Sequence, residues 1–173
     1  MVSIYPNSQI YNMTHMYNIN DLRGKPVKPV YPDNTIMGYI SSSEHFTLFS
    51  KIICKSKMDG KLSDKLANRT LFAVSDNDLR KKYPDSYFDT IDDGFARHII
   101  RYSTLDRKID KDILTASPIC LFNTFSDANK MCVTNIYGQT MIDSNIRIVH
   151  FNQPVDNGIV HIVNDLLVPK YLI

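Results

Sequence analysis

The sequence has no tryptophan, only 6 glycines among 173 residues, and only 3 cysteines. No glycine lies in a G-x-G-x-x-G or G-x-x-x-x-G-K arrangement, so the common phosphate-binding loops are absent. The metalloprotease motif H-E-x-x-H and the nucleophile motif G-x-S-x-G are absent as well. No run approaches the roughly 20 apolar residues that a membrane-spanning helix needs. We therefore predict no catalytic residues, no cofactor and no membrane span.

The charge is nearly balanced, with 20 Lys and Arg against 18 Asp and Glu. Because the formal net charge is only +2, the chain as a whole has no strong attraction for nucleic acid, and we predict no nucleic-acid partner. The N-terminal stretch lacks the basic and apolar regions of a secretory signal. The location is left open by the sequence: an intracellular or virion location fits, and an extracellular one requires another export route.

The three cysteines are Cys54, Cys120 and Cys132. An odd count leaves at least one thiol free unless chains are crosslinked, and the absence of a C-x-x-C spacing argues against zinc. Cys120 and Cys132 are symmetric about Ser126, the middle of an expected hairpin. They could face each other and form a disulfide in an oxidising environment, although two ordinary buried cysteines are the favoured interpretation.

Histidine and acidic residues do not form a recognisable metal motif. The five histidines include no pair at i and i+4, and His150 and His161, on neighbouring expected strands, lack further ligands. Asp92 and Asp93 fit the acidic first turn of a helix and no calcium-loop repeat follows them. We predict no metal site.

Residues 1–34 form the first expected region. Prolines are frequent there, and no helical or alternating period persists through the region. We expect an extended N-terminal arm, followed by one folded domain at 35–173. The candidate contacts of the arm with the domain are Ile4, Tyr5, Ile10 and Tyr11.

Helical signals follow the arm. Ser41 and Glu44 fit a capping box, in which a hydroxyl and a carboxylate each satisfy a free backbone amide. An apolar stripe at helical spacing comes next, and we expect that helix to end near 59–60. Leu62 and Leu66 suit a further short helical turn. The stripe consists of Phe46, Leu48, Phe49, Ile52 and Ile53.

The short, largely apolar segment at 70–74 predicts a buried strand. Ser75 is expected to cap a helix whose first turn is acidic. Another helix should start after Gly94, and Asp110 should cap a small one.

From residue 118 onward the hydrophobic period changes to two, which is typical of strands. The segments 119–125 and 131–138 flank turn residues and predict a hairpin, and three further strands follow at 139–142, 147–151 and 159–163. Because helices come first and strands later, we predict an α+β fold with an antiparallel sheet.

Three stretches resemble the signatures of fasciclin-like (FAS1) domains. They are TLFAVSDNDL at 70–79, IIRYSTLDRKI at 99–109 and NGIVHIVNDLLVP at 157–169. The matching or nearly matching residues are Thr70, Phe72, Ala73, Ser75, Asp76, Tyr102, Asn157, Gly158, His161, Leu167 and Pro169. Val74, Ser103 and Asn164 depart from the family pattern.

The resemblance implies a wedge-shaped β-sandwich of about seven mostly antiparallel strands with several helices packed on one side. It also implies a non-enzymatic binding or adhesion module with a protein or glycan partner. Asn152-Gln153 stand where some members carry an integrin-binding dipeptide, so that contact is not expected. KDIL at 111–114 is interpreted as a helix start. The resemblance gives a structural role to Thr70, Phe72, Ala73, Tyr102, Asn157, Gly158, His161 and Pro169.

An alternative function keeps the same fold. The chain would be a structural or assembly protein of a viral particle or intracellular complex, with self-association through the N-terminal arm. A histidine-centred hydrolase is the least supported hypothesis, since no nucleophile arrangement is visible. Asn12 and Asn68 begin glycosylation sequons that matter only in an exported protein.

His161 lies inside an aliphatic strand. Strand alternation places Ile159, His161 and Val163 on one face and Val160 and Ile162 on the other. A buried neutral imidazole must have its N–H satisfied, at a cost of roughly 1–3 kcal/mol if it is not. We therefore expect His161 to be a structural hydrogen-bond hub whose partner is Tyr102 or a backbone carbonyl.

Overall fold

The computed structural model describes residues 29–126 and 129–170. Its helices all precede strand β3 in the chain and are α1 (Ile36–Ser42), α2 (Thr47–Ser56), α3 (Asp59–Ser63), α4 (Asp76–Arg80), α5 (Tyr87–Thr90), α6 (Asp93–Tyr102) and α7 (Lys111–Leu114). Its strands are β1 (Arg69–Val74), β2 (Thr104–Leu105), β3 (Ile119–Asn123), β4 (Lys130–Ile136), β5 (Gln139–Ile142), β6 (Ile146–Val155) and β7 (Gly158–Val163). No helix in these residues has the length and hydropathy that crossing a bilayer requires.

The strands form one sheet in the order β2-β1-β7-β6-β5-β4-β3. Every neighbouring pair is antiparallel except β1 and β7, which run parallel with Phe72 opposite His161. Just beyond β3, the N–H of Phe125 donates to the carbonyl of Thr104 in β2 at 3.0 Å. The two ends of the sheet therefore nearly meet. The predicted α+β fold with about seven mostly antiparallel strands is confirmed.

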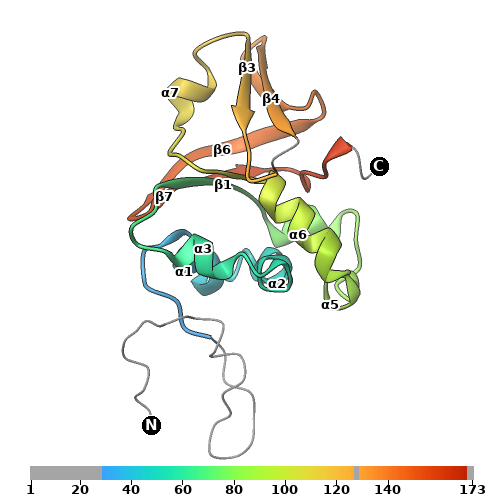
Figure 1. The fold of residues 1–173 in the computed structure, drawn as a ribbon. Coiled ribbons are helices and arrows are strands. Elements are labelled where there is room, and N and C mark those ends of the chain that lie inside the picture. The colour runs from blue at the N-terminus through green and yellow to red at the C-terminus, as the bar shows by residue number, and fades with distance from the viewer. Residues whose placement is uncertain (1–28, 127–128, 171–173) are drawn as a thin grey trace, which may run out of the picture.

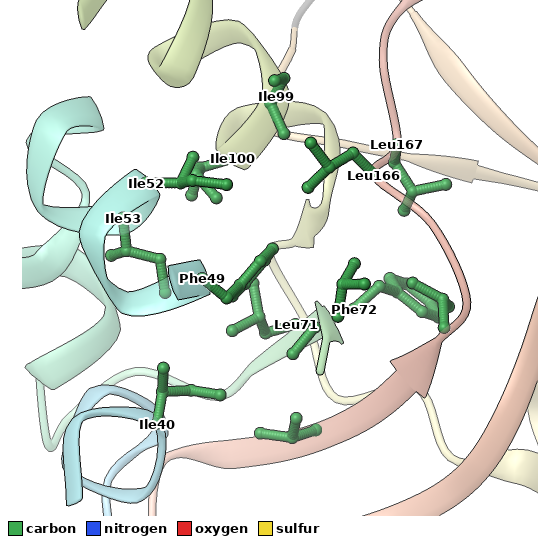
Figure 2. Packing of buried hydrophobic residues seen from close by; sticks show 14 of the residues in the cluster. Ile40, Phe49, Ile52, Ile53, Leu71, Phe72, Ile99, Ile100, Leu166 and Leu167 are labelled. Carbon is green, nitrogen blue, oxygen red and sulfur yellow. The ribbon is translucent and has the colours of Figure 1, made fainter. Parts of the chain in front are cut away.

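The helices form a layer against β1 and β7, the first and last strands in the chain. Figure 1 shows α1, α2, α3, α5 and α6 gathered on one side of β1 and β7, while β3 and β4 stand on the other side. Figure 2 shows side chains from α2 and α6 meeting those of β1 and the segment after β7. These buried side chains are Phe49, Ile52, Ile53, Leu71, Phe72, Ile99, Ile100, Leu166 and Leu167. Burying this apolar surface is the main source of stability.

The predicted capping box at Ser41 and Glu44 is wrong. Ser41 lies inside α1, whose N-cap is Thr35, with the Thr35 hydroxyl accepting the N–H of Gly38 at 3.0 Å. Helix α2 begins only at Thr47 and has no capping side chain of its own. A carboxylate distant in sequence takes that role instead, which local spacing does not reveal.

The predicted end of α2 is also several residues late. Lys57 adopts the left-handed conformation, with φ of 62°, and stops α2 after Ser56. A separate helix, α3, then starts at Asp59 and buries Leu62. Leu66 is 96% exposed and lies outside any helix, so the prediction of a helical turn there is wrong.

Three local predictions are confirmed by the structure, and a fourth is nearly so. The strand expected at 70–74 is β1, and Ser75 caps α4 by accepting the N–H of Asp78. Helix α6, expected to start after Gly94, starts earlier, at Asp93, and Asp92, expected in its acidic first turn, is its N-cap. Asp110 caps α7 through the N–H of Ile113. Each cap is a side chain three residues before the amide it satisfies, so a short stretch of sequence contains both partners.

The hairpin of β3 and β4 forms as predicted, but its register excludes the candidate disulfide. Cys120 lies opposite Val133, and Cys132 lies opposite Leu121. The register is one residue away from symmetry about Ser126, and neighbouring residues of a strand point to opposite faces. The two thiols therefore lie on opposite faces of the hairpin, and both are free and half-buried.

Strand β6 is longer than predicted because it contains a bulge. Its pairing with β7 shifts between His150 and Gln153, which leaves Phe151 and Asn152 opposite His161. Asn152 has a φ of 63°, in the left-handed region. A bulge hides a strand from simple alternation, because the two-residue period slips by one at that point.

The described chain begins inside the expected N-terminal arm. Tyr31 is buried, and its hydroxyl donates to the carboxylate of Asp59 in α3 at 3.0 Å. The expected arm contacts at Ile4, Tyr5, Ile10 and Tyr11 lie outside the described residues. The boundary at residue 34 stays a prediction.

Candidate functional site

The connection between β2 and α7, residues 106–110, is held by side chains from β1 and β7. The Thr70 hydroxyl donates to the carbonyl of Arg107 at 2.7 Å and accepts the N–H of Ile109 at 2.8 Å. The carbonyl of Ile109 lies 2.7 Å from Nε2 of His161. Two residues of different signature stretches thus fix the same short connection.

His161 is fully buried, and both of its ring nitrogens are used by the backbone. Nδ1 accepts the N–H of Asn152 at 3.0 Å, so Nε2 carries the proton and donates it to the Ile109 carbonyl. The imidazole is therefore the neutral Nε2–H tautomer. Of the two partners expected from the sequence, the backbone carbonyl is present, and Tyr102 is not the partner.

The surroundings keep His161 uncharged. Burial lowers its pKa below the ordinary value of 6.5, against the opposing effects of the Ile109 carbonyl and the Asp110 carboxylate. The ring packs against Phe72 at 5.4 Å and Phe151 at 5.7 Å between centroids. Because neither nitrogen faces solvent or a reacting group, His161 pins the β6 bulge to the β2–α7 connection.

Asn157 joins three parts of the domain. Its side-chain oxygen accepts the N–H of Ile36, at the start of α1, at 2.7 Å. Its side-chain amide donates to the carbonyls of Leu62 and Asp64, at the end of α3, both at 3.0 Å. The residue is fully buried, so it satisfies helix ends that water cannot reach.

Gly158 leaves room for the neighbouring strand. Its φ is 150°, and a Cβ atom there would lie 1.8 Å from the carbonyl oxygen of Arg69. The parallel pairing of β1 and β7 starts at this contact, since Arg69 lies opposite Gly158. Any side chain at 158 would push β7 away from β1.

Tyr102 is also buried, in a different part of the domain. Its hydroxyl donates to Asp143 at 2.5 Å and lies 3.4 Å from the carbonyl of Lys130. Burial, followed by the hydrogen bond to Asp143 and its charge, raises the pKa of Tyr102 far above its usual range. The other Asp143 oxygen accepts the N–H of Cys132 at 3.2 Å. Tyr102 thus attaches α6 to β4 and the β5–β6 turn.

The remaining signature residues are apolar. Phe72 and Ala73 of β1 are fully buried, and Pro169 is buried in the segment after β7. At the departures from the family pattern, the Ser103 hydroxyl donates to the carbonyl of Ile99 at 2.8 Å. The Asn164 side chain accepts the N–H of Arg147 at 2.9 Å. Both polar substitutes are therefore satisfied by the backbone.

Three important polar residues are missed or misread from the sequence. Asp76 was expected only as a first-turn acid of α4, yet its carboxylate accepts the N–H groups of Thr47 and Leu48 at 3.3 and 2.9 Å. Asp143 accepts the hydroxyl hydrogen of Tyr102, and the backbone N–H of Asn152 donates to Nδ1 of His161. The only sequence signal for these two is a polar residue in or next to a strand.

The other predicted positions are dispersed. His150 is exposed on β6 opposite Ile162, and Asn68 is exposed just before β1. Asn12 lies outside the described residues. Within residues 29–126 and 129–170, no group of three His, Cys, Asp or Glu side chains is arranged to hold a metal ion.

A groove of about 470 Å³ opens between the α1–α2 turn and strands β6 and β7. Its aromatic lining residues are Tyr39, Phe46 and Phe151, and its polar ones are His45, Ser75, Asp78, His150 and Gln153. The Ser75 hydroxyl is occupied in capping α4. Phe151 reaches from this groove to the buried ring of His161. The groove offers aromatic surface and hydrogen-bonding groups, which suits binding more than covalent chemistry.

Comparisons with known proteins agree with this architecture. The sequence matches the family model of the fasciclin domain over residues 44–169. Among 22 matching chains of solved structures is a FAS1 domain pair from the insect cell adhesion molecule fasciclin I. It is 20% identical with a TM-score of 0.65, and the match covers 81% of this chain and 52% of that chain. The chain thus spans about half of the domain pair. No curated protein sequence matches it.

Proposed function

Because the chain belongs to the fasciclin (FAS1) domain family, we propose that it is a non-enzymatic module that binds a protein or glycan partner at its surface. FAS1 domains are typically modules of adhesion and binding and are generally non-catalytic. The sequence is only 20% identical to the solved domain pair, so that similarity supports the fold and not a shared partner. The partner class is therefore argued from the residues of this chain.

The use of the buried polar side chains supports a role without catalysis. Thr70, His161 and Asn157 each bond to backbone groups of other elements, and Tyr102 bonds to Asp143. A catalytic base must reach a substrate proton, and a nucleophile must be exposed beside a base. These side chains instead hold elements together.

The groove beside β6 and β7 is the observation that carries the proposal. It combines buried or half-buried aromatic rings with exposed side chains that donate and accept hydrogen bonds, including His45, His150 and Gln153. Aromatic surface surrounded by a few polar groups is typical of recognition sites. Protein surfaces and sugars both present apolar groups. Both also present hydroxyl or amide groups that can form hydrogen bonds with such a site.

A binding screen tests this proposal. The full chain would be applied to a glycan array and to a panel of immobilised extracellular and viral proteins, beside the double variant His150→Ala/Gln153→Ala. We expect at least one saturable interaction that the groove variant weakens at least tenfold. The double variant Lys65→Ala/Asn68→Ala changes exposed residues outside the groove and serves as the matched control.

Two results contradict the proposal. One is a saturable interaction that the groove variant and the control retain equally, which places binding elsewhere. The other is turnover of a substrate by the full chain that His161→Gln abolishes without unfolding the protein.

The organisation of the chain belongs to the same proposal. We assign the binding module to residues 35–173 and treat residues 1–34 as an appended arm. The family match at 44–169 and the N-cap of α1 at Thr35 support this division, although Tyr31 already packs in the core. Asn12 and Asn68 remain candidate glycan acceptors if the protein is exported, and Asn68 is exposed.

A further inference from the structure

Strands β3, β4 and β5 have an outer face without charged residues. Ile119 of β3 lies opposite Thr134 of β4, which in turn lies opposite Met141 of β5. Residues opposite one another on paired strands, and alternate residues along each strand, point to the same side of a sheet. We call this side the outer face and define it by Ile119, Leu121, Cys132, Thr134, Ile136, Gln139 and Met141.

The two faces of these strands differ in exposure. Met131 and Val133 of β4 point inward and are fully buried. Ile119 and Leu121 on the outer face are 64% and 61% exposed, and Ile136 is 56% exposed. The solvated face of an antiparallel sheet is normally polar. Three large aliphatic side chains on such a face therefore indicate a contact beyond the described domain.

Tyr137 extends the outer face at the turn that follows β4. The residue is fully exposed, and its φ of 51° lies in the left-handed region. Tyrosine is strained in this conformation, where asparagine is favoured. Strained residues concentrate at functional sites, because the surroundings must compensate for the strain. Neither burial in its own domain nor turn geometry explains a tyrosine here, whereas contact with a partner does.

The outer face is large enough for an interface between proteins. Its most exposed apolar residues together with the turn tyrosine expose about 500 Å², near the upper end of what monomeric proteins leave uncovered. The remaining residues of the face are half-buried or polar and lie between or beside them. With these included, the face approaches the roughly 800 Å² per partner that a standard interface covers.

The absence of charge favours a second copy of the chain as the occupant. The nearest charged side chains on this side of the sheet are Lys130, opposite Asn123, and Arg147, opposite Met141, both at the border. Two identical uncharged faces meet without placing like charges together. A charged partner protein finds no group of opposite sign in the middle of this face. Twofold symmetry uses the same face twice, which buries about 1,000–1,600 Å² in total.

We propose that two copies of the chain associate through this outer face, sheet against sheet, as a twofold-symmetric dimer. The face of one copy covers Ile119, Leu121 and Ile136 of the other, and Tyr137 serves as an aromatic anchor at the end of the contact. The two sheets lie about 10 Å apart, as facing sheets do. The outer face shares no residue with the groove beside β6 and β7, so the dimer goes beyond the proposed partner binding and is independent of it.

Light scattering of the full chain across a range of concentrations tests the dimer. We expect the molar mass of the unmodified chain to rise toward twice 19.9 kDa. Ile119→Lys and Ile136→Lys should each raise the dissociation constant at least tenfold, because each places a charge inside an apolar contact. Both positions are more than half exposed, so the lysine stays solvated in the monomer and the fold is retained.

Tyr137→Asn separates loss of contact from damage to the fold. Asparagine relieves the strain of the turn, so the monomer should become more stable. Removal of the ring should nevertheless raise the dissociation constant at least fivefold. A weaker dimer formed by a more stable monomer supports the proposal, and a dimer that this variant and both lysine variants leave intact overturns it.

Leu66→Lys is the matched control for added charge. Leu66 is 96% exposed and lies between α3 and β1, outside the outer face. This variant should keep the dissociation constant of the unmodified chain, and a rise equal to that of Ile119→Lys overturns the assignment to the outer face. An unmodified chain that stays monomeric at every concentration also overturns the proposal, and it leaves the face to another part of the same chain or to a different protein.

Sodium chloride provides a second test of an apolar contact. Salt screens interactions between exposed charges and leaves apolar contacts in place. The dissociation constant should therefore stay the same or fall as the salt concentration rises. Dissociation of the dimer by salt overturns the proposal.

The dimer measurement is distinct from the partner screen. Loss of the dimer in Ile119→Lys with retained binding to a groove partner supports both proposals. Failure of the groove screen with a dimer that the outer-face variants weaken contradicts the proposed function alone.

Discussion

Gly158 shows how a single missing side chain positions the central strands. A Cβ at this position would overlap the carbonyl of Arg69, and the φ of 150° already disfavours any residue other than glycine. We expect Gly158→Ala to lower the free energy of unfolding by about 3 kcal/mol or more, because β1 and β7 must move apart. Urea denaturation followed by circular dichroism measures this change.

The matched control for Gly158 is another glycine. Gly60 has no heavy atom within 4 Å of the built Cβ position and lies in α3. Alanine there should be neutral or raise stability by up to about 1 kcal/mol, since alanine favours helix. If alanine lowers the free energy of unfolding equally at positions 158 and 60, the close approach of Gly158 to Arg69 does not explain the effect.

His161 predicts a pH dependence of stability. Its folded-state pKa lies below the unfolded value of 6.5, chiefly because of burial. Above pH 6.5 the ring is neutral in both states and its full contribution is present. As the pH falls below 6.5, the unfolded chain binds a proton that the folded chain excludes, so stability declines by up to about 1.4 kcal/mol per pH unit. The decline continues until the pH reaches the folded pKa.

Denaturation midpoints between pH 5 and pH 8 measure this effect. His161→Gln should remove the contribution to the slope and lower stability at pH 8 by about 1–3 kcal/mol through lost hydrogen bonds. His150→Gln changes an exposed imidazole and should keep the slope of the unmodified protein. If the slope survives in His161→Gln, another group is responsible for it.

At the scale of elements, α2 depends on a cap supplied from α4. Asp76 accepts the N–H of Leu48 at 2.9 Å and the Thr47 hydroxyl at 2.6 Å. Asp76→Ala should lower the free energy of unfolding by about 2 kcal/mol, because buried amides at a helix start lose their partner. The neighbouring change Asn77→Ala, at an exposed position, should cost less than about 0.5 kcal/mol. If Asp76→Ala lowers the free energy of unfolding by less than about 0.5 kcal/mol, water replaces the cap.

The β4–β5 hairpin contains an unfavourable turn residue. Ile136 pairs with Gln139, and the two residues between them, Tyr137 and Gly138, have φ of 51° and 77°. Turns with two such residues favour Asn-Gly, whereas tyrosine is strained there. Tyr137→Asn should therefore raise the free energy of unfolding by about 1 kcal/mol, measured by urea denaturation at concentrations where the protein is monomeric.

Gly138→Ala provides the contrasting change in the same turn. It should lower stability by about 1 kcal/mol, because alanine disfavours a positive φ. Destabilisation by Tyr137→Asn would show that the tyrosine ring makes contacts whose loss outweighs the relieved strain.

At the scale of the whole molecule, one hydrophobic core spans the helical layer and both halves of the sheet. The cluster extends from Ile36 in α1 to Met131 and Val133 in β4 and to Leu167 near the C-terminal end of the described chain. Because the two halves share one core, we expect them to unfold together. Phe72 contributes to this core from β1, an interior strand of the sheet.

Two probes test this cooperativity. Far-ultraviolet circular dichroism reports the helices and strands, and tyrosine fluorescence reports packing, since the chain has no tryptophan. Their urea transitions should coincide, and Phe72→Ala should shift both equally, at a cost of about 3–5 kcal/mol. Separate transitions would show that the β3–β4–β5 half folds as its own unit.

Much of the local structure could be predicted because its causes are local. Ser75, Asp92 and Asp110 cap helices through amides three residues away, and alternation marks β3, β4 and β7. The failed capping box at Ser41 has the opposite explanation. The residue that caps α2 lies 28 positions from the amide of Leu48, and no pattern around the helix start points to it.

In the candidate site, too, the sequence predicted some features and not others. The signature residues Thr70, Asn157 and His161 were predicted as structural from their resemblance to a family. For His161 a backbone carbonyl was among the predicted partners, but the residue that supplies it was not predicted. The partners are backbone groups of Ile109, Ile36 and other residues distant in sequence. A backbone carbonyl has no residue type, so the sequence contains no signal for it.

The sequence by itself determined the order of helices and strands, the local caps and the resemblance to the fasciclin family, because hydrophobic period and capping act over a few residues. The tertiary structure alone decided that β1 and β7 run parallel, that the β3–β4 register separates the two thiols, and which groove lies beside His161. Those features depend on which surfaces meet when distant segments bury their apolar faces. That outcome is settled by packing and by the satisfaction of backbone hydrogen bonds across the whole domain.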